Sequence, residues 1–238
     1  QAPKQLQMTG QLTGDGLRQA KEMGMVSRLA LNTMGRANYQ ATIGIKRGQP
    51  ELLITSDLKG LSLTLPPPLN KPNTTTLPLR IETQLTKDSV SAKPKVLQDV
   101  LRVSLGRAAS ATYVRDLSQP QAKVMSGMIL VGVNAADSAL TRNNGVALNL
   151  NLPYLDVDAW SQLLSSSAGV PLGGALPKSK VSPKNARVVG LSADAGNAMD
   201  YLPTTIAVRA DQIKLTERVL HQVVVGGSRA GDVWRLNT

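Results

Sequence analysis

The residue best suited to catalysis in this sequence is its single histidine, His221. With one histidine and no cysteine, the chain offers no nitrogen and sulfur ligand set for zinc. A Ser-His-Asp triad would depend entirely on His221. Gln98 occupies the matching position of a repeated pattern described below, so that position accepts a side chain without imidazole chemistry. We interpret His221 as a structural or surface residue and expect a His221→Gln protein to fold and bind normally.

Two carboxylates, Asp156 and Asp158, have the D-x-D spacing of some cation sites. They also open the clearest helical pattern in the chain, where short acidic side chains cap the free N–H groups of a first turn. Capping needs fewer assumptions than a metal ion. The glycine-rich stretches at 14–16 and 226–231 lack the strand, loop and helix context of a phosphate-binding loop. The sequence therefore predicts no catalytic group, no metal site and no cofactor, and a protein that is not an enzyme.

The charge of the chain is strongly positive, at +11 with a pI near 10.1. Its 27 Lys and Arg residues are dispersed, and only Lys178, Lys180, Lys184 and Arg187 form a local cluster. Aromatic residues amount to 3%, which leaves few stacking platforms for single-stranded nucleic acid. The dispersion favours a solvated basic exterior over nucleic-acid binding. A module that binds polyanions through its charge remains an alternative.

Apolar residues that alternate with polar ones are the main structural signal, and this period of two predicts strands with one apolar face. We predict a mostly β protein: an elongated, twisted antiparallel sheet of repeated units that forms an open groove, with one or two short helices. Because only one or two short helices are expected, little apolar helix surface is available to cover the sheet. The residues expected to line the groove are Leu61, Leu63, Leu65, Leu79, Ile81, Val146, Leu148, Leu150, Leu152, Val223 and Val225.

A strand pattern occurs twice, because 60–65 and 77–85 resemble 145–152 and 202–210. This duplication predicts two β units, 1–120 and 121–238, that stack on one another. Helices are expected near 15–23 and 156–164, and a long loop at 165–200. Asn144-Gly145 is a strong hairpin signal between strands at 128–133 and 146–152.

Several stretches, taken in order, resemble the YhdP family of large AsmA-like proteins of the Gram-negative envelope. They are SDLKGLSLTLPPPLNK at 56–71, LPLR at 77–80, LDVDAW at 155–160, and the tail from Leu202-Pro203 to Trp234-Arg235-Leu236. The resemblance covers roughly Leu52 to the C-terminus. It implies a periplasmic β-groove that carries phospholipid acyl chains between the inner and outer membranes and supports the permeability barrier.

The resemblance also implies partners: phospholipid, the inner membrane through a helix absent from this sequence, and other envelope proteins. No apolar run approaches the roughly 18 residues of a membrane helix, so we expect a segment of a longer, membrane-anchored protein. A purely structural β segment, whose sheet is closed by its own helices and loops, is the second alternative.

Overall fold

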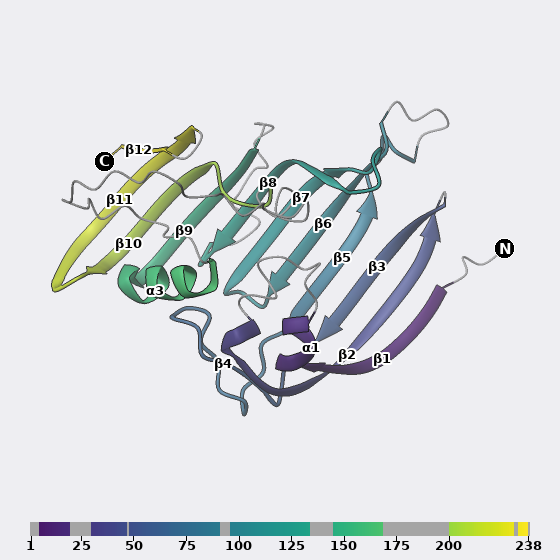
Figure 1. The fold of residues 1–238 in the computed structure, drawn as a ribbon, viewed down its shortest axis with the longest axis horizontal. Coiled ribbons are helices and arrows are strands. Elements are labelled where there is room, and N and C mark those ends of the chain that lie inside the picture. The colour runs from purple at the N-terminus through teal and green to yellow at the C-terminus, as the bar shows by residue number, and fades with distance from the viewer. Residues whose placement is uncertain are drawn as a thin grey trace, which may run out of the picture.

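The computed structural model describes residues 5–19, 30–46, 48–90, 96–133, 145–168, 200–230 and 233–237. They form one open sheet of twelve strands, with two helices beside the strand ends on one side (Figure 1). The predicted mostly β, open sheet is confirmed. The strands are β1 (Gln5–Thr13), β2 (Thr33–Lys46), β3 (Gln49–Ser56), β4 (Leu61–Leu63), β5 (Leu79–Leu85), β6 (Gln98–Leu105), β7 (Ala109–Asp116), β8 (Lys123–Val131), β9 (Gly145–Asp156), β10 (Thr205–Leu215), β11 (Arg218–Ala230) and β12 (Val233–Asn237). The helices are α1 (Gly14–Gln19) and α3 (Val157–Ala168), and η2 (Ala30–Asn32) is a 3-10 turn.

Eleven strands follow the path β1-β2-β3-β5-β6-β7-β8-β9-β10-β11-β12, and β4 pairs with β2 off this path. Most neighbours are antiparallel, as predicted. The exceptions are β8–β9 and β9–β10, which are parallel. The predicted hairpin at Asn144-Gly145 is therefore wrong, because a hairpin joins antiparallel strands and parallel neighbours need a longer crossover. Residues 134–144 of that connection lie outside the described part of the chain.

The predicted equivalence of the strands at 60–65 and 145–152 is also wrong. The first forms the three-residue β4, paired only with β2, whereas the second forms β9, which lies between β8 and β10 in the main sheet. Alternation over a few residues looks the same in a short outlying strand and in a central one. The division into units at about residue 120 remains a prediction, although β7 and β8 pair across it.

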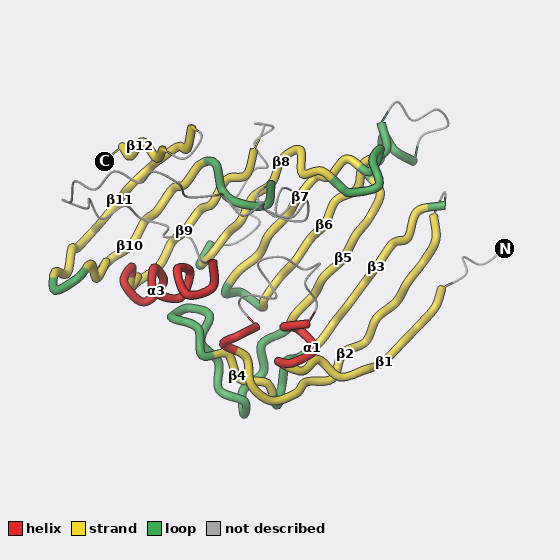
Figure 2. The backbone as a smooth tube through the Cα atoms, in the orientation of Figure 1, coloured by secondary structure: helices red, strands yellow, loops and turns green. Residues whose placement is uncertain are grey.

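The strand ends along one side of the sheet carry α1, β4 and α3 together with the loop 57–77 (Figure 2). We call this side, which is distinct from the edge strands β1 and β12, the closed edge. The loop reaches β2 because two glycines permit a close approach. A Cβ on Gly35 would lie 2.3 Å from the carbonyl oxygen of Gly60, and both residues have positive φ angles that favour glycine. Leu61, 1% exposed, packs there with Ala37 and Leu58.

Lys71 fastens the loop from within. Its side chain is 4% exposed, and its Nζ donates to the carbonyl oxygens of Leu61 at 2.7 Å and Pro72 at 3.0 Å. Burial lowers the pKa of Lys71, although the nearby Asp57 carboxylate acts in the opposite direction. The closed edge is thus a small packed layer with its own core.

The two predicted helices are present with different bounds. The N-terminal helix ends at Gln19, and residues 20–23 lie outside the described ranges. The second helix, α3, begins after Asp156 and continues to Ala168, into the stretch predicted as loop. The remainder of that predicted loop, with its lysine cluster at 178–187, is not among the described residues.

Candidate functional site: one apolar face of the sheet

The register places a single row of apolar residues across all eleven strands of the main path. Residues paired across neighbouring strands project from the same face of a sheet, so the pairing can be followed from one edge to the other. The row, in strand order, is Met8, Ala41, Ile54, Ile81, Val103, Ala111, Ile129, Leu148, Ile206, Gly227 and Leu236. We call the face that carries this row the apolar face.

The neighbouring row, displaced by one residue, projects from the opposite face and is mostly polar. It consists of Gln7, Thr42, Leu53, Glu82, Arg102, Thr112, Met128, Ala147, Thr205, Ser228 and Arg235. On this polar face Glu82 forms ion pairs with Arg80 and, at 3.5 Å, with Arg102. The sheet is therefore amphipathic over most of its width; the exception is β8, where Met128 and Leu130 are apolar and buried on the polar face.

Eight of the eleven predicted groove residues lie on the apolar face. They are Leu79, Ile81, Val146, Leu148, Leu150, Leu152, Val223 and Val225. The other three belong to the closed edge: Leu61 and Leu65 are buried, and Leu63 packs against the same cluster. Sequence reasoning missed Val103, Ile129 and Ile206 as members of the face, although each sits in an alternating strand pattern that could have identified it.

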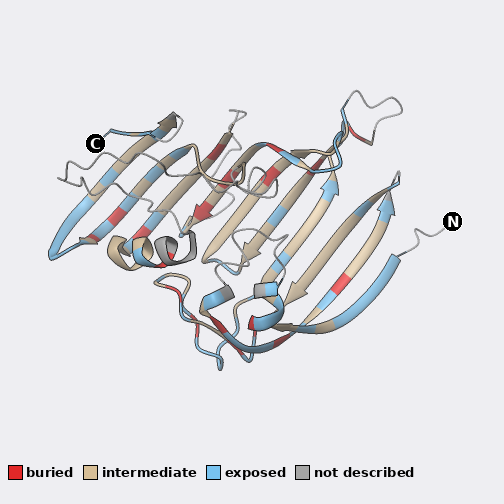
Figure 3. Ribbon diagram, viewed as in Figure 1, coloured by how far each residue is buried: buried red, intermediate tan, exposed pale blue. Residues whose placement is uncertain are grey.

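Much of the apolar face is only half-buried, including Ile54, Ile81, Leu148, Leu150 and Val208. Figure 3 shows buried positions as short bands in a sheet that is otherwise intermediate or exposed. At the two ends of the row Met8 is 41% exposed and Leu236 is 62% exposed. A sheet face this apolar normally packs against a second layer. Partial exposure of such a face is typical of surfaces that bind apolar partners.

A shallow cavity of about 250 Å³ lies at β9, β10 and β11. Its lining combines Leu150, Val208 and Val225, which form one row of the apolar face, with neighbouring residues of the opposite face: Asn149, Ala207, Arg209, Val224 and Gly226. The surface of the cavity is formed almost entirely by apolar atoms.

The centre of the apolar face is the exception, because it is covered. Tyr113 and Val146, which are 8% and 1% exposed, form a buried cluster with Val124 on β7, β8 and β9. Tyr201 packs on this cluster from the segment that precedes β10. Its ring meets that of Tyr113 edge to face, with centroids 5.0 Å apart.

An ion pair sits beside this aromatic contact. Arg115 donates through Nε to Asp99 at 2.9 Å and through Nη2 to the second carboxylate oxygen, and the two side chains are 16% and 7% exposed. Burial acts to lower the pKa of Arg115, but hydrogen bonds to Asp99 and to Tyr201 outweigh it, so this pKa lies above its ordinary value. Burial, with a smaller effect of Tyr201, raises the pKa of Tyr113 to about 12. These polar groups are satisfied within the protein.

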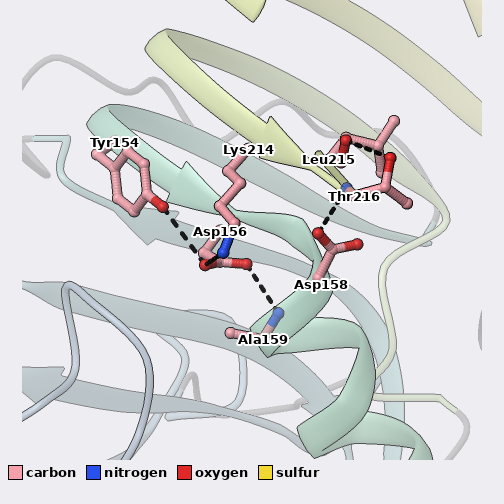
Figure 4. A network of polar contacts seen from close by, with 7 residues as sticks. All are labelled: Tyr154, Asp156, Asp158, Ala159, Lys214, Leu215 and Thr216. Carbon is pink, nitrogen blue, oxygen red and sulfur yellow. Dashed lines mark hydrogen bonds and ion pairs between the residues drawn. The ribbon is translucent and has the colours of Figure 1, made fainter. Parts of the chain in front are cut away.

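The carboxylates that sequence reasoning weighed as a cation site hold α3 in place instead (Figure 4). Asp156 caps the helix, accepting from the Ala159 amide at 2.9 Å, and pairs with Lys214 at 3.2 Å. Asp158 accepts from the Thr216 amide at 2.6 Å. The capping interpretation is confirmed for Asp156, while Asp158 ties the helix to the turn between β10 and β11.

Asp156→Asn is expected to reduce the acid sensitivity of the protein. The Ala159 amide, followed by Lys214, holds the pKa of Asp156 below its ordinary value of 3.8. A carboxylate whose folded pKa is depressed stabilises the fold above its unfolded pKa, and this contribution is lost as pH falls through the folded pKa. Asparagine still caps the helix but carries no charge. The variant should therefore melt below the parent at neutral pH, and the difference should shrink below pH 3.8.

The control is Asp88→Asn, which changes an exposed carboxylate and should leave no such pH-dependent difference. Melting temperatures measured between neutral pH and about pH 3 give the comparison. A difference between parent and Asp156→Asn that stays constant over this range would contradict the assignment.

Groups suited to other chemistry do not assemble in the part of the chain described. No three His, Cys, Asp or Glu side chains cluster there as a metal site requires. His221 is exposed and pairs across strands with Gln212. None of the helices described has the length and apolar content that crossing a bilayer requires.

Comparison with known proteins identifies one family. The family model described as "YhdP protein" matches residues 1–238, which extends the resemblance from Leu52 back to the start of the sequence. Searches of curated proteins and of solved structures returned no match to the chain.

Proposed function

The chain belongs to the YhdP family, and from this premise we propose that its apolar face is the floor of a trough that carries phospholipid acyl chains across the cell envelope. The trough is a segment of a longer periplasmic protein held at the inner membrane, and it supports the outer-membrane permeability barrier. The protein binds and guides lipid and carries out no catalysis.

The uninterrupted apolar row across eleven strands is the observation that supports this proposal most strongly. Each methylene group of an acyl chain that leaves water gains about 0.8 kcal/mol. A face that is apolar from one edge of the sheet to the other offers this gain along its full width. The polar face, with its Glu82, Arg80 and Arg102 pairs, keeps the other side of the sheet in water.

The absence of cysteine from the chain permits a direct test of the two faces. Leu150 and Asn151 are neighbours on β9 and project from opposite faces. Leu150→Cys and Asn151→Cys proteins are mixed with phosphatidylethanolamine–phosphatidylglycerol vesicles that contain a phospholipid with a maleimide at the end of one acyl chain. We expect lipid to attach to the Leu150→Cys protein and not to the Asn151→Cys protein, as seen by mass spectrometry.

Salt distinguishes this trough from a polyanion-binding surface. Exposed charges are screened within about 10 Å at 0.1 M salt and within still less at about 0.5 M, whereas burial of acyl chains persists. Attachment to the Leu150→Cys protein should survive about 0.5 M salt. Attachment that disappears in salt would favour the polyanion alternative. Equal attachment at both positions, with a soluble maleimide reacting equally at both, would contradict the trough.

A further inference from the structure

We propose that Tyr201 closes the middle of the trough, so that an acyl chain reaches Tyr113 on β7 and Val146 on β9 only after the Tyr201 side chain has moved aside. This inference rests on the proposed lipid-binding function and assigns one residue the control of lipid passage within it.

The first support is where the cover lies. Tyr113 and Val146 are buried against Tyr201, in the row of the apolar face next to the one that contains the half-buried residues Ile81 and Leu148. The segment that carries Tyr201 extends from the start of β10 across β9 toward β8 (Figure 1). This cover therefore lies between the open parts of the apolar face toward β1 and toward β12.

The second support is the closed edge, which covers the same part of the sheet from the other end of the strands. Leu79 on β5 and Leu105 on β6 pack against the cluster of Leu61 there. Between these two covers the row continues through Val103, Ala111 and Ile129, which are half-buried. An acyl chain that follows the row must pass this point.

The third support is how the cover is attached. Thr204, at the base of the cover, is held firmly. Its amide donates to the Val146 carbonyl at 2.7 Å, and its carbonyl accepts from the Arg229 amide at 2.7 Å. A Cβ on Gly145 would lie 2.4 Å from Thr204 Oγ1, so the glycine leaves room for this anchor.

Tyr201, at the tip of the cover, is held by weaker contacts. They are the edge-to-face ring contact, a long 3.4 Å hydrogen bond from the Tyr113 hydroxyl to the Tyr201 carbonyl, and a side-chain hydrogen bond from Arg115. The Tyr201 side chain can leave while Thr204 stays in place, since the anchor bonds the backbone of Val146 and the tip only packs on the cluster that contains its side chain.

Movement of the Tyr201 side chain away from the cluster leaves no charge unpaired and exposes apolar surface. Arg115 keeps its bidentate pairing with Asp99 whether or not Tyr201 is present, so departure of the tyrosine leaves no unpaired charge. What it uncovers is mainly apolar: Val146 and the ring of Tyr113. This surface suits an acyl chain better than it suits water.

The test uses three thiols introduced singly into the cysteine-free chain: Val146→Cys under the cover, and Ile81→Cys and Leu150→Cys at half-buried positions outside it. Each protein is treated with the acyl-maleimide phospholipid in vesicles. In the parent background the Val146→Cys thiol is expected to react on the order of tenfold more slowly than the other two, the factor that corresponds to one well-placed aromatic contact. Adding Tyr201→Ala should raise its rate to that of the flanking thiols.

Two further variants separate the cover from a general loosening of the fold. Tyr201→Phe keeps the ring and should keep the Val146→Cys thiol slow. Tyr39→Ala removes an aromatic from the same face of the sheet on β2 and should not change the rate at Val146→Cys. Unchanged rates at Ile81→Cys and Leu150→Cys in the Tyr201→Ala background show that the sheet is intact.

The outcomes distinguish the two proposals. Lipid attachment at the flanking thiols, with the same rate at Val146→Cys in parent and Tyr201→Ala proteins, would overturn the role of Tyr201 and leave the trough standing. No attachment at any of the three thiols would overturn the trough, and the inference with it.

Discussion

Leu148→Asp is expected to leave the protein folded and abolish acyl-chain binding, whereas Val146→Asp, two residues earlier on the same face of β9, is expected to unfold it. Val146 is 1% exposed beneath Tyr201, so a carboxylate there would be an unpaired charge without water. Such a charge costs several kcal/mol, which is a large part of the stability of a domain. Leu148 is half-buried, and a carboxylate at its position can stay hydrated at the surface of the trough.

Thermal unfolding and lipid attachment, measured on both variants, provide the check. Attachment is read from a Leu150→Cys thiol, which lies next to Leu148 on the same face. Asn149→Asp, between them on the polar face, is the control and should match the parent in both measurements. A Leu148→Asp protein that is folded and still takes up lipid as well as the parent would contradict the trough at this position. Unfolding of this variant to the extent of Val146→Asp would indicate a closed core.

Breaking the Asp99–Arg115 pair is expected to have the second large effect. Asp99→Leu leaves the Arg115 guanidinium unpaired in a site where it is 16% exposed, and Arg115→Met leaves the still more buried Asp99 carboxylate unpaired. Each single change should cost on the order of 3 kcal/mol of unfolding free energy, because an uncompensated buried charge is strongly destabilising.

The double variant Asp99→Leu/Arg115→Met should recover most of this loss, since an apolar pair of similar size carries no desolvation cost. Urea unfolding of the four proteins measures the coupling. Arg80→Gln on the polar face is the control: that side chain is 52% exposed, and exposed pairs contribute less than about 1 kcal/mol. Single variants within about 0.5 kcal/mol of the parent would contradict the assignment.

The alternation of residues in the sequence is sufficient to predict the fold class and most of the candidate site. Side chains alternate between faces in any strand, so Leu148, Leu150 and Leu152 must share a face whatever their neighbours are. The lack of apolar helix surface to cover this face could also be read from the sequence. The helix after Asp156 was equally predictable, because its cap and its first turn are local features.

Tertiary structure alone decided which strands are neighbours and in which direction they run. The pattern around Asn144-Gly145 is compatible with a hairpin, and only the pairing of β9 with β8 and β10 shows that it crosses over instead. The Leu61 strand has the alternation of a trough wall, yet it packs at the closed edge because Gly35 and Gly60 allow two backbones to approach there. The cover formed by Tyr201 joins residues 88 positions apart. Contacts at such separation depend on the path of the whole chain, and no local pattern contains them.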